Sequence, residues 1–263
     1  MATIVTFHAH PDDEAIVSGG TMAKAAAEGH RVVLVVATRG ERGELPAGGL
    51  ATGEDLGALR ARETHEAARI LGVARCEFLG YVDSGMAGTA TNGDPDCFWQ
   101  AGVDEAAGRL AAILGEEAAD VLTVYDEVGG YGHPDHIQVH RVGVRAGELA
   151  GTPRVYEATY EREYVTELMR AAAESGRLDD VPGDFDPAQF GSPAAAITTR
   201  VAVHDFLPAK RLAMAAHASQ IPETSFFLAM DDDQFAATWG TEWYIRRGAP
   251  AGTSETSVFD GVG

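Results

Sequence analysis

Residues 4–14 read Ile-Val-Thr-Phe-His-Ala-His-Pro-Asp-Asp-Glu, an apolar run that ends in two histidines and three consecutive acids. The apolar part has the length and the β-branched character of a short strand. Five ionisable side chains in the last seven residues suit a site better than a core, because a buried charge is costly unless it is paired or binds a metal. The stretch therefore predicts a buried strand with a polar site at its end.

The sequence after this stretch predicts a βαβ unit. Residues 18–28 are rich in alanine and end at Gly29, as a helix does, and residues 31–37 (Arg-Val-Val-Leu-Val-Val-Ala) form an apolar strand. A near-continuous apolar strand is typical of a sheet that is covered on both faces. Because such crossovers are right-handed, strands 3–7 and 31–37 should be parallel, with His10 at the carboxyl end of the first.

Helical and strand patterns alternate along the rest of the chain. The alternation predicts an α/β fold with three layers (α/β/α) and a Rossmann-like, mostly parallel sheet. We expect a single domain of residues 1–263, in which 1–150 form the core sheet with the site and 151–263 form capping and substrate-side elements. The expected helices are 54–71, 104–117, 134–150, 161–175 and 206–219, and the expected strands are 76–79, 121–125, 155–160, 197–203 and 241–246.

Composition narrows the class of partner. The formal net charge is −20 over 263 residues, so we expect no nucleic-acid partner, since phosphate binding needs a surplus of cations. We also expect no membrane partner, because no apolar run approaches the roughly 18 residues of a membrane span. Two cysteines are too few for a disulfide framework, which favours a cytoplasmic location. A metal ion and a small-molecule substrate suit this chain better.

A second polar cluster follows the strand expected at 121–125: Asp-Glu-Val-Gly-Gly-Tyr-Gly-His-Pro-Asp-His at 126–136. Pro134 suits the first turn of the helix that follows. His133 and His136 are three residues apart, so they lie on one helical face. Ligands of open parallel sheets bind at the carboxyl ends of the strands, where the two clusters would meet.

Imidazole and carboxylate groups without thiolates indicate a catalytic zinc site, in which three protein ligands leave one position for water. The water needs a base, and the charge that develops on the substrate needs a stabilising group. Spacing alone does not decide which of Asp12 and Asp13 binds the metal, nor which of His133 and His136 does. Taken alone, the first cluster also fits an ordinary acidic helix N-terminus.

Both clusters resemble the motifs of a known enzyme family. Ala-His-Pro-Asp-Asp-Glu at 9–14 and Gly-His-Pro-Asp-His at 132–136 resemble the PIG-L/LmbE zinc-dependent N-deacetylases, which remove acetyl from N-acetylglucosamine conjugates. The chain is most similar to the actinobacterial mycothiol branch, with its GlcNAc-inositol deacetylases and mycothiol S-conjugate amidases. Further similarity lies at 40–44, 83–89, 125–131 and 216–220.

The resemblance implies roles for the polar residues. The metal ligands would be His10, Asp13 and His136, holding one Zn²⁺ per chain, with Fe²⁺ as the alternative metal. Asp12 would be the general base that later protonates the leaving amine. His133 would face the oxyanion. The other implied site residues are Asp135, which would orient His133, Tyr131, which would assist at the oxyanion, and Arg62, Asp83, Met86 and His217, which would bind substrate.

We therefore expect a metal-dependent amide hydrolase that deacetylates a glucosamine-containing small molecule. One alternative is an amidase that cleaves a larger acyl group, the cysteinyl amide of a mycothiol conjugate. An alternative of another class is a non-catalytic sugar-binding α/β protein with a structural metal. Asp12 discriminates between these classes, because a structural zinc has four protein ligands and no use for a spare carboxylate.

Overall fold

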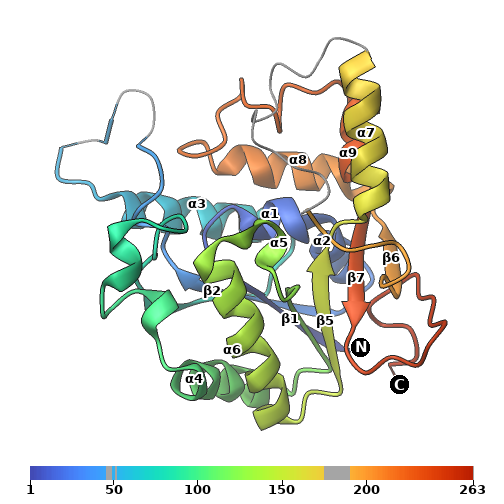
Figure 1. Cartoon of the computed structure of the whole chain (residues 1–263), viewed down its shortest axis with the longest axis horizontal. Coiled ribbons are helices and arrows are strands. Elements are labelled where there is room, and N and C mark those ends of the chain that lie inside the picture. Colours follow the sequence, from blue (N-terminus) through green and yellow to red (C-terminus); the bar gives the residue numbers. More distant parts are fainter. Residues whose placement is uncertain (46–48, 51, 175–189, 263) are drawn as a thin grey trace.

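The computed structural model describes residues 1–45, 49–50, 52–174 and 190–262. Its centre is a mixed sheet with the strand order β3-β2-β1-β4-β5-β7-β6 (Figure 1), so the expected α/β class is confirmed. In the described part of the chain the strands are β1 (Thr3–His8), β2 (Arg31–Thr38), β3 (Arg75–Tyr81), β4 (Val121–Tyr125), β5 (Arg154–Thr159), β6 (Thr199–Ala202) and β7 (Thr241–Arg246).

Parallel pairing joins the first five strands. β1 pairs with β2 from Thr3↔Arg31 to His8↔Val36 and with β4 through Ile4↔Val121, so it lies inside the sheet. Its residues after Thr3 are all buried, which explains why its sequence is apolar rather than alternating. β7 runs antiparallel between β5 and β6. The sheet is thus mostly parallel, with an antiparallel edge.

The expected helices begin close to their observed positions, but the described part of the chain holds three further α-helices that were not expected. The helix expected at 18–28 is preceded by a second one, because the backbone turns at Ser18 (φ −136°) and helical structure already starts at Asp13. The helix Asp232–Trp239 was also missed, although its N-cap Asp231 forms a capping box with Gln234, and so was the short helix Gly129–Gly132. The described helices are α1 (Asp13–Val17), α2 (Gly19–Ala27), α3 (Leu56–Ile70), α4 (Val103–Glu116), α5 (Gly129–Gly132), α6 (Pro134–Ala150), α7 (Arg162–Glu174), α8 (Leu207–Ala216) and α9 (Asp232–Trp239).

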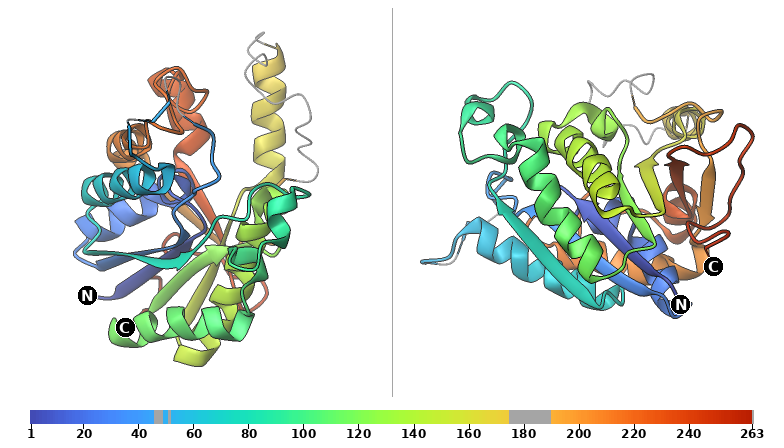
Figure 2. Two further views of the ribbon diagram at one scale, coloured as in Figure 1. Left: turned by 90° about the vertical axis from the view of Figure 1, so that its left-hand side faces the viewer. Right: turned by 90° about the horizontal axis from the view of Figure 1, so that it is seen from below.

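Alternate residues of β1 enter two different cores. Ile4 packs with residues of α1, α2, α8 and α9, whereas Val5 and Phe7 pack with residues of α4 and α6. The sheet therefore lies between two helical layers (Figure 2), as the three-layer prediction requires. None of the helices in the described part is long and apolar enough to cross a membrane.

The C-terminal elements are fastened to the first helices by a buried ion pair. Lys210 Nζ on α8 donates to Ile16 O and to Glu242 Oε1, both at 2.7 Å. The Glu242 carboxylate on β7 also accepts from the backbone N–H groups of Gly20 and Thr21, each at 2.8 Å. Ser18 makes no side-chain cap at this helix, so Glu242 satisfies the first free N–H groups of α2 instead.

Candidate functional site

The loops after β1 and β4 lie side by side at the carboxyl ends of these two strands. These strands are parallel neighbours, and the strand order reverses between them, since β2 and β3 follow on one side and β5 on the other. This is the position at which open α/β sheets bind ligands. The two polar clusters of the sequence come together there, as predicted.

The first cluster forms a tight turn into α1. Asp12 has φ 89°, a left-handed backbone that aspartate tolerates better than most residues. Its N–H donates to Glu14 Oε2 at 3.0 Å. The N–H of His10 donates to Asp13 Oδ2 at 2.9 Å. These two hydrogen bonds fix the conformation of the turn, in which the Asp13 carboxylate contacts His136 after β4.

The second cluster depends on a close glycine contact. Gly129 has φ 66°, and a Cβ added there would lie 2.6 Å from the Cβ of His136. Glycine thus lets the turn fold back onto the start of α6. His133 caps that helix, because its Nδ1 accepts the N–H of Asp135 at 3.1 Å. When His133 is neutral, its proton therefore lies on Nε2.

Three histidine rings meet between the clusters. The ring centroid of His10 lies 4.6 Å from that of His133 and 5.4 Å from that of His136, and the last two are 5.2 Å apart. Asp13 Oδ2 lies 3.4 Å from His10 Nδ1 and 3.3 Å from His136 Nε2. All four side chains are buried.

These residues fit a divalent metal ion. His136 Nε2 is buried and has no hydrogen-bond partner, which is costly unless another group binds it. Ligand atoms of His10, His133 and His136 lie within 4.8 Å of one another. Asp13 is not in that trio, yet its carboxylate contacts two of the three histidines. Imidazole and carboxylate donors of this kind suit zinc or iron.

Burial and neighbouring charges set the protonation of the cluster. Burial opposes the charge on His10, but the Asp13, Asp135 and Asp83 carboxylates hold its pKa well above the usual value. Burial and the two other histidines lower the pKa of His133 to about 4. Burial also raises the pKa of Asp12 to about 6, against the opposing effect of a nearby arginine. A carboxylate in that range suits proton transfer near neutral pH.

The resemblance implied that Asp135 orients His133, but the carboxylate of Asp135 faces other residues. Asp135 Oδ2 lies 3.1 Å from His10 Nε2 and accepts the N–H of Ser84 at 2.9 Å, while Oδ1 accepts the Ser84 hydroxyl. His133 is oriented by the backbone N–H of Asp135 instead. The reason is the loop at 82–101, which brings Ser84 against the start of α6.

Tyr131 and Asp83 lie beside the histidines. The ring of Tyr131 is half exposed, with its centroid 4.9 Å from that of His136. Asp83 Oδ1 lies 3.6 Å from His10 Nε2. Met86 follows on the same loop and is 55% exposed. Tyr131 and Asp83 thus lie beside the histidines, and Met86 is an exposed residue of the loop that carries Asp83.

Arg62 does not reach the cluster, whereas Arg60 does. Arg62 on α3 is exposed and pairs with Glu54. Arg60 is buried and donates to Pro11 O at 2.7 Å, with the same Nη2 3.3 Å from Asp12 Oδ2. The sequence could have indicated Arg60, because at helical spacing it lies on the same face of α3 as the small residues Thr64, Ala67 and Ala68, which are buried.

His217 lies behind the site rather than on its surface. It is fully buried just after α8, and its Nε2 donates to Glu14 Oε1 at 2.5 Å. The other oxygen of Glu14 accepts the N–H of Asp12. His217 thus contacts Glu14 on the inner side of the turn. Because its side chain is fully buried, a substrate would not touch it directly.

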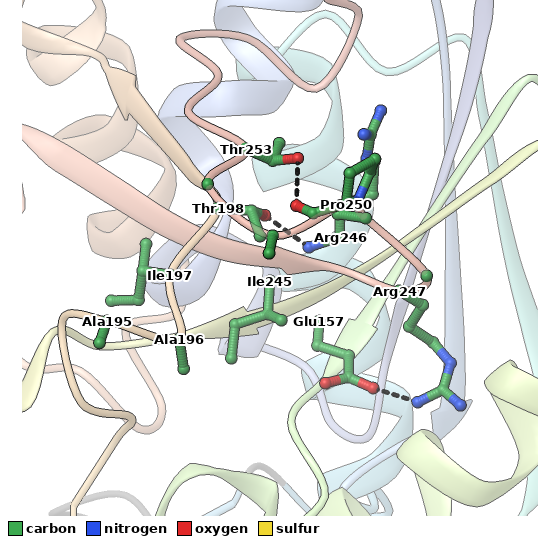
Figure 3. A pocket seen from close by; sticks show the side chains of 14 residues that line it. Glu157, Ala195, Ala196, Ile197, Thr198, Ile245, Arg246, Arg247, Pro250 and Thr253 are labelled. Carbon is green, nitrogen blue, oxygen red and sulfur yellow. Dashed lines mark hydrogen bonds and ion pairs between the residues drawn. The ribbon is translucent and has the colours of Figure 1, made fainter.

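A cavity of about 470 Å³ lies elsewhere, along β5 and β7 (Figure 3), and none of the histidines described above lines it. Its charged groups are already paired. Glu157 contacts Arg247 at 2.5 Å, and Arg246 contacts Glu255 at 2.8 Å. The charged residues that line the cavity therefore already have partners, unlike His136 of the histidine cluster.

Residues 5–147 match the family model described as PIG-L, GlcNAc-PI de-N-acetylase. A relative from Streptomyces avermitilis, named 1D-myo-inositol 2-acetamido-2-deoxy-alpha-D-glucopyranoside deacetylase, is 40% identical over 291 residues, covering 98% of this chain and 97% of the relative. A relative of the same name from Nocardiopsis dassonvillei is 42% identical over 281 residues, covering 97% and 99%.

Solved structures share the fold. The N,N'-diacetylchitobiose deacetylase from Pyrococcus horikoshii, solved with its inhibitor MPG, superposes with a TM-score of 0.56. The two chains are 22% identical, and the match covers 93% of this chain and 83% of the other. At that identity the likeness concerns the layered sheet and its helices.

Proposed function

The chain belongs to the PIG-L family of GlcNAc-PI de-N-acetylases, and on that premise we propose that it hydrolyses the acetamide of an N-acetylglucosamine-containing small molecule. GlcNAc-inositol is the first substrate to test, because relatives about 40% identical over nearly the whole chain carry that name. The observation that carries the proposal is Asp12, a carboxylate that faces Arg60 beside the metal cluster without joining it.

His10, Asp13 and His136 hold the metal in this proposal. The unpartnered His136 Nε2 and the two contacts of Asp13 support that set. When bound, the metal ion supplies Lewis acidity, which polarises the amide carbonyl and lowers the pKa of a water molecule. Zinc fits these donors, and iron(II) satisfies them as well.

Asp12 acts as the proton carrier. It takes a proton from the attacking water and later delivers one to the leaving amine, so that a neutral amine departs. Arg60 and Pro11 hold the turn in which it lies. A metal with only a structural role would leave this carboxylate without a task.

His133 donates to the oxygen on which negative charge develops. Its Nδ1 is occupied by the N–H of Asp135, so the neutral ring presents an Nε2–H donor. Such a donor is effective when it is fixed before the reaction begins. Tyr131, half exposed beside His136, assists at the same oxygen. Asp83 accepts hydrogen bonds from sugar hydroxyls, and Met86 packs against the sugar.

The two unpaired cysteines, Cys76 and Cys97, support a reducing compartment. We therefore propose that the enzyme acts in the cytoplasm.

A substrate panel tests the proposal. The purified protein, with zinc or anaerobic iron(II), is assayed for free amine on GlcNAc-inositol, on simple N-acyl glucosamines and on a mycothiol S-conjugate. We expect acetyl release from GlcNAc-inositol to be fastest. Faster cleavage of the conjugate would make the chain an amidase for a larger acyl group. If the protein bound no stoichiometric divalent metal, and metal did not raise its Tm, the proposed site would be wrong.

A further inference from the structure

The loop at 82–101, here called the flap, reaches the metal cluster through the adjacent residues Asp83 and Ser84, and Ser84 makes the hydrogen bonds to Asp135. Ser84 is fully buried, and both its N–H and its hydroxyl donate to the carboxylate of Asp135. That carboxylate also accepts from His10 Nε2 at 3.1 Å. A continuous chain of hydrogen bonds therefore runs from the flap to a residue that we assign to the metal.

Ser84 is also the internal hub of the flap. Its hydroxyl accepts the N–H of Trp99 at 2.9 Å. Its carbonyl accepts from Thr91 Oγ1 at 2.8 Å and from Asn92 Nδ2 at 2.7 Å. Both ends and the middle of the flap therefore converge on the residue that contacts Asp135.

The same contacts select one nitrogen of His10 for the metal. Nε2 points to Asp135, while Nδ1 lies 3.4 Å from Asp13 Oδ2 on the other side of the ring. A carboxylate accepts but never donates, so the bond to Asp135 places a proton on Nε2, and Nδ1, on the side of the proposed ligand Asp13, is the nitrogen left to bind the metal. A ligating histidine held at its second nitrogen by a carboxylate is a more basic and better oriented ligand.

We propose that Ser84 is a positioning residue that couples the order of the flap to the affinity of the site for its metal. The hydroxyl fixes the Asp135 carboxylate, and Asp135 fixes the ring and tautomer of His10. Coupling of this kind is reciprocal. Metal binding stabilises the flap that carries Asp83 and Met86, and an ordered flap strengthens metal binding.

The proposal rests on the metal role of His10 and not on the identity of the substrate. Its test is therefore made without substrate. Zinc affinity is measured by competition with a fluorescent chelator for the wild-type chain, for Ser84→Ala and for Asp135→Asn. We expect about tenfold weaker binding for Ser84→Ala and between tenfold and a hundredfold for Asp135→Asn.

A matched control lies in the same loop. Thr91→Val removes a hydroxyl that bonds to the Ser84 carbonyl but does not touch Asp135. We expect its zinc affinity to fall by no more than about twofold, because it loosens the flap while both bonds from Ser84 to Asp135 remain. Visible spectra of the cobalt(II) forms give a readout that loss of general stability would not move: Ser84→Ala should alter them, and Thr91→Val should not.

Hydrogen exchange tests the reciprocal effect. Zinc should slow exchange of the peptide amides at 84–99 in the wild-type chain, and much less in Ser84→Ala. Equal zinc affinity in the two proteins, with equal protection of the flap by zinc, would overturn the coupling. Failure of the wild-type chain to bind zinc or iron would instead refute the proposed function. If Ser84→Ala does not fold, Asp135→Asn decides the question by the same measurements.

Discussion

The parallel and antiparallel parts of the sheet serve the site in different ways. Parallel β1 and β4 end in the loops that carry the histidines and carboxylates of the cluster. Antiparallel β7 contributes Glu242, and α8 and the residue after it contribute Lys210 and His217. All three are buried; Lys210 pairs with Glu242, and His217 bonds to Glu14 beneath the turn of the site. The reactive groups thus follow the ends of the parallel strands, whereas β7 and α8 provide buried residues that hold the nearby helices in place. Removing a strand-end group should cost activity, and removing a supporting group should first cost stability.

The largest effect is expected from Asp12→Asn. Asparagine tolerates the left-handed backbone of Asp12 but cannot take a proton, so kcat/KM should fall by about 10³-fold. Zinc content and Tm should remain those of the wild type, and both are measured on the same preparation. Full hydrolase activity with zinc bound would show that Asp12 is not the base.

The next effect concerns the supporting side. Lys210→Met leaves the buried Glu242 carboxylate without its cation, which should lower the free energy of unfolding by about 3 kcal/mol. Glu242 keeps two backbone N–H donors, so kcat of the folded protein should change much less than in Asp12→Asn. Urea denaturation measures the first quantity, and the amine assay measures the second.

A double variant provides the control for Lys210→Met. Lys210→Met with Glu242→Gln removes both charges, so its cost should be smaller than the sum of the two single variants. Strict additivity would mean that the pair is not coupled.

Glu14 joins the two regions, and its substitution should have an intermediate effect. Glu14→Gln keeps the shape of the side chain, but its amide has only one acceptor oxygen, so it cannot accept from both His217 and the N–H of Asp12. We expect kcat to fall by about tenfold with KM unchanged, because a bond to a charged group exceeds a neutral one by roughly 1 kcal/mol. A change confined to KM would place Glu14 in substrate binding instead.

The smallest effect is expected from Arg62→Ala. Arg62 is exposed and pairs with Glu54 on the surface, so kcat/KM should stay within about twofold of wild type. Arg60→Ala is the matched comparison on the same helix and should lower kcat/KM by at least tenfold, since Arg60 holds the Asp12 turn. The reverse order would restore the assignment made from the sequence.

The sequence predicted the parallel core well, because its signals are local. Apolar runs ended by glycine or by polar clusters predicted β1, β2 and β4, and the right-handed crossover brought their loops to one edge. The position of β7 between β5 and β6 was not predictable in this way. It depends on pairing between segments far apart in the chain, which no local pattern encodes.

Side-chain direction was the second limit. Arg60 and Arg62 are two residues apart on α3 and so point to different sides of the helix, and only the phase of the whole helix decides which one faces the site. Asp135 raised a similar difficulty. Its carboxylate turns toward Ser84 because of the flap, whose packing the sequence did not reveal.

The strand order β5-β7-β6 also governs the sequence of events during synthesis. Glu242 follows Gly20, whose N–H it caps, by 222 residues. Helix α2, which follows the loop of His10 and Asp12, therefore lacks the partner of its first N–H groups until β7 has been made. β6 likewise waits for β7 before it can join the sheet. The N-terminal helices beside the metal-binding loops can therefore complete their contacts only after β7, 222 residues further along the chain, has been translated.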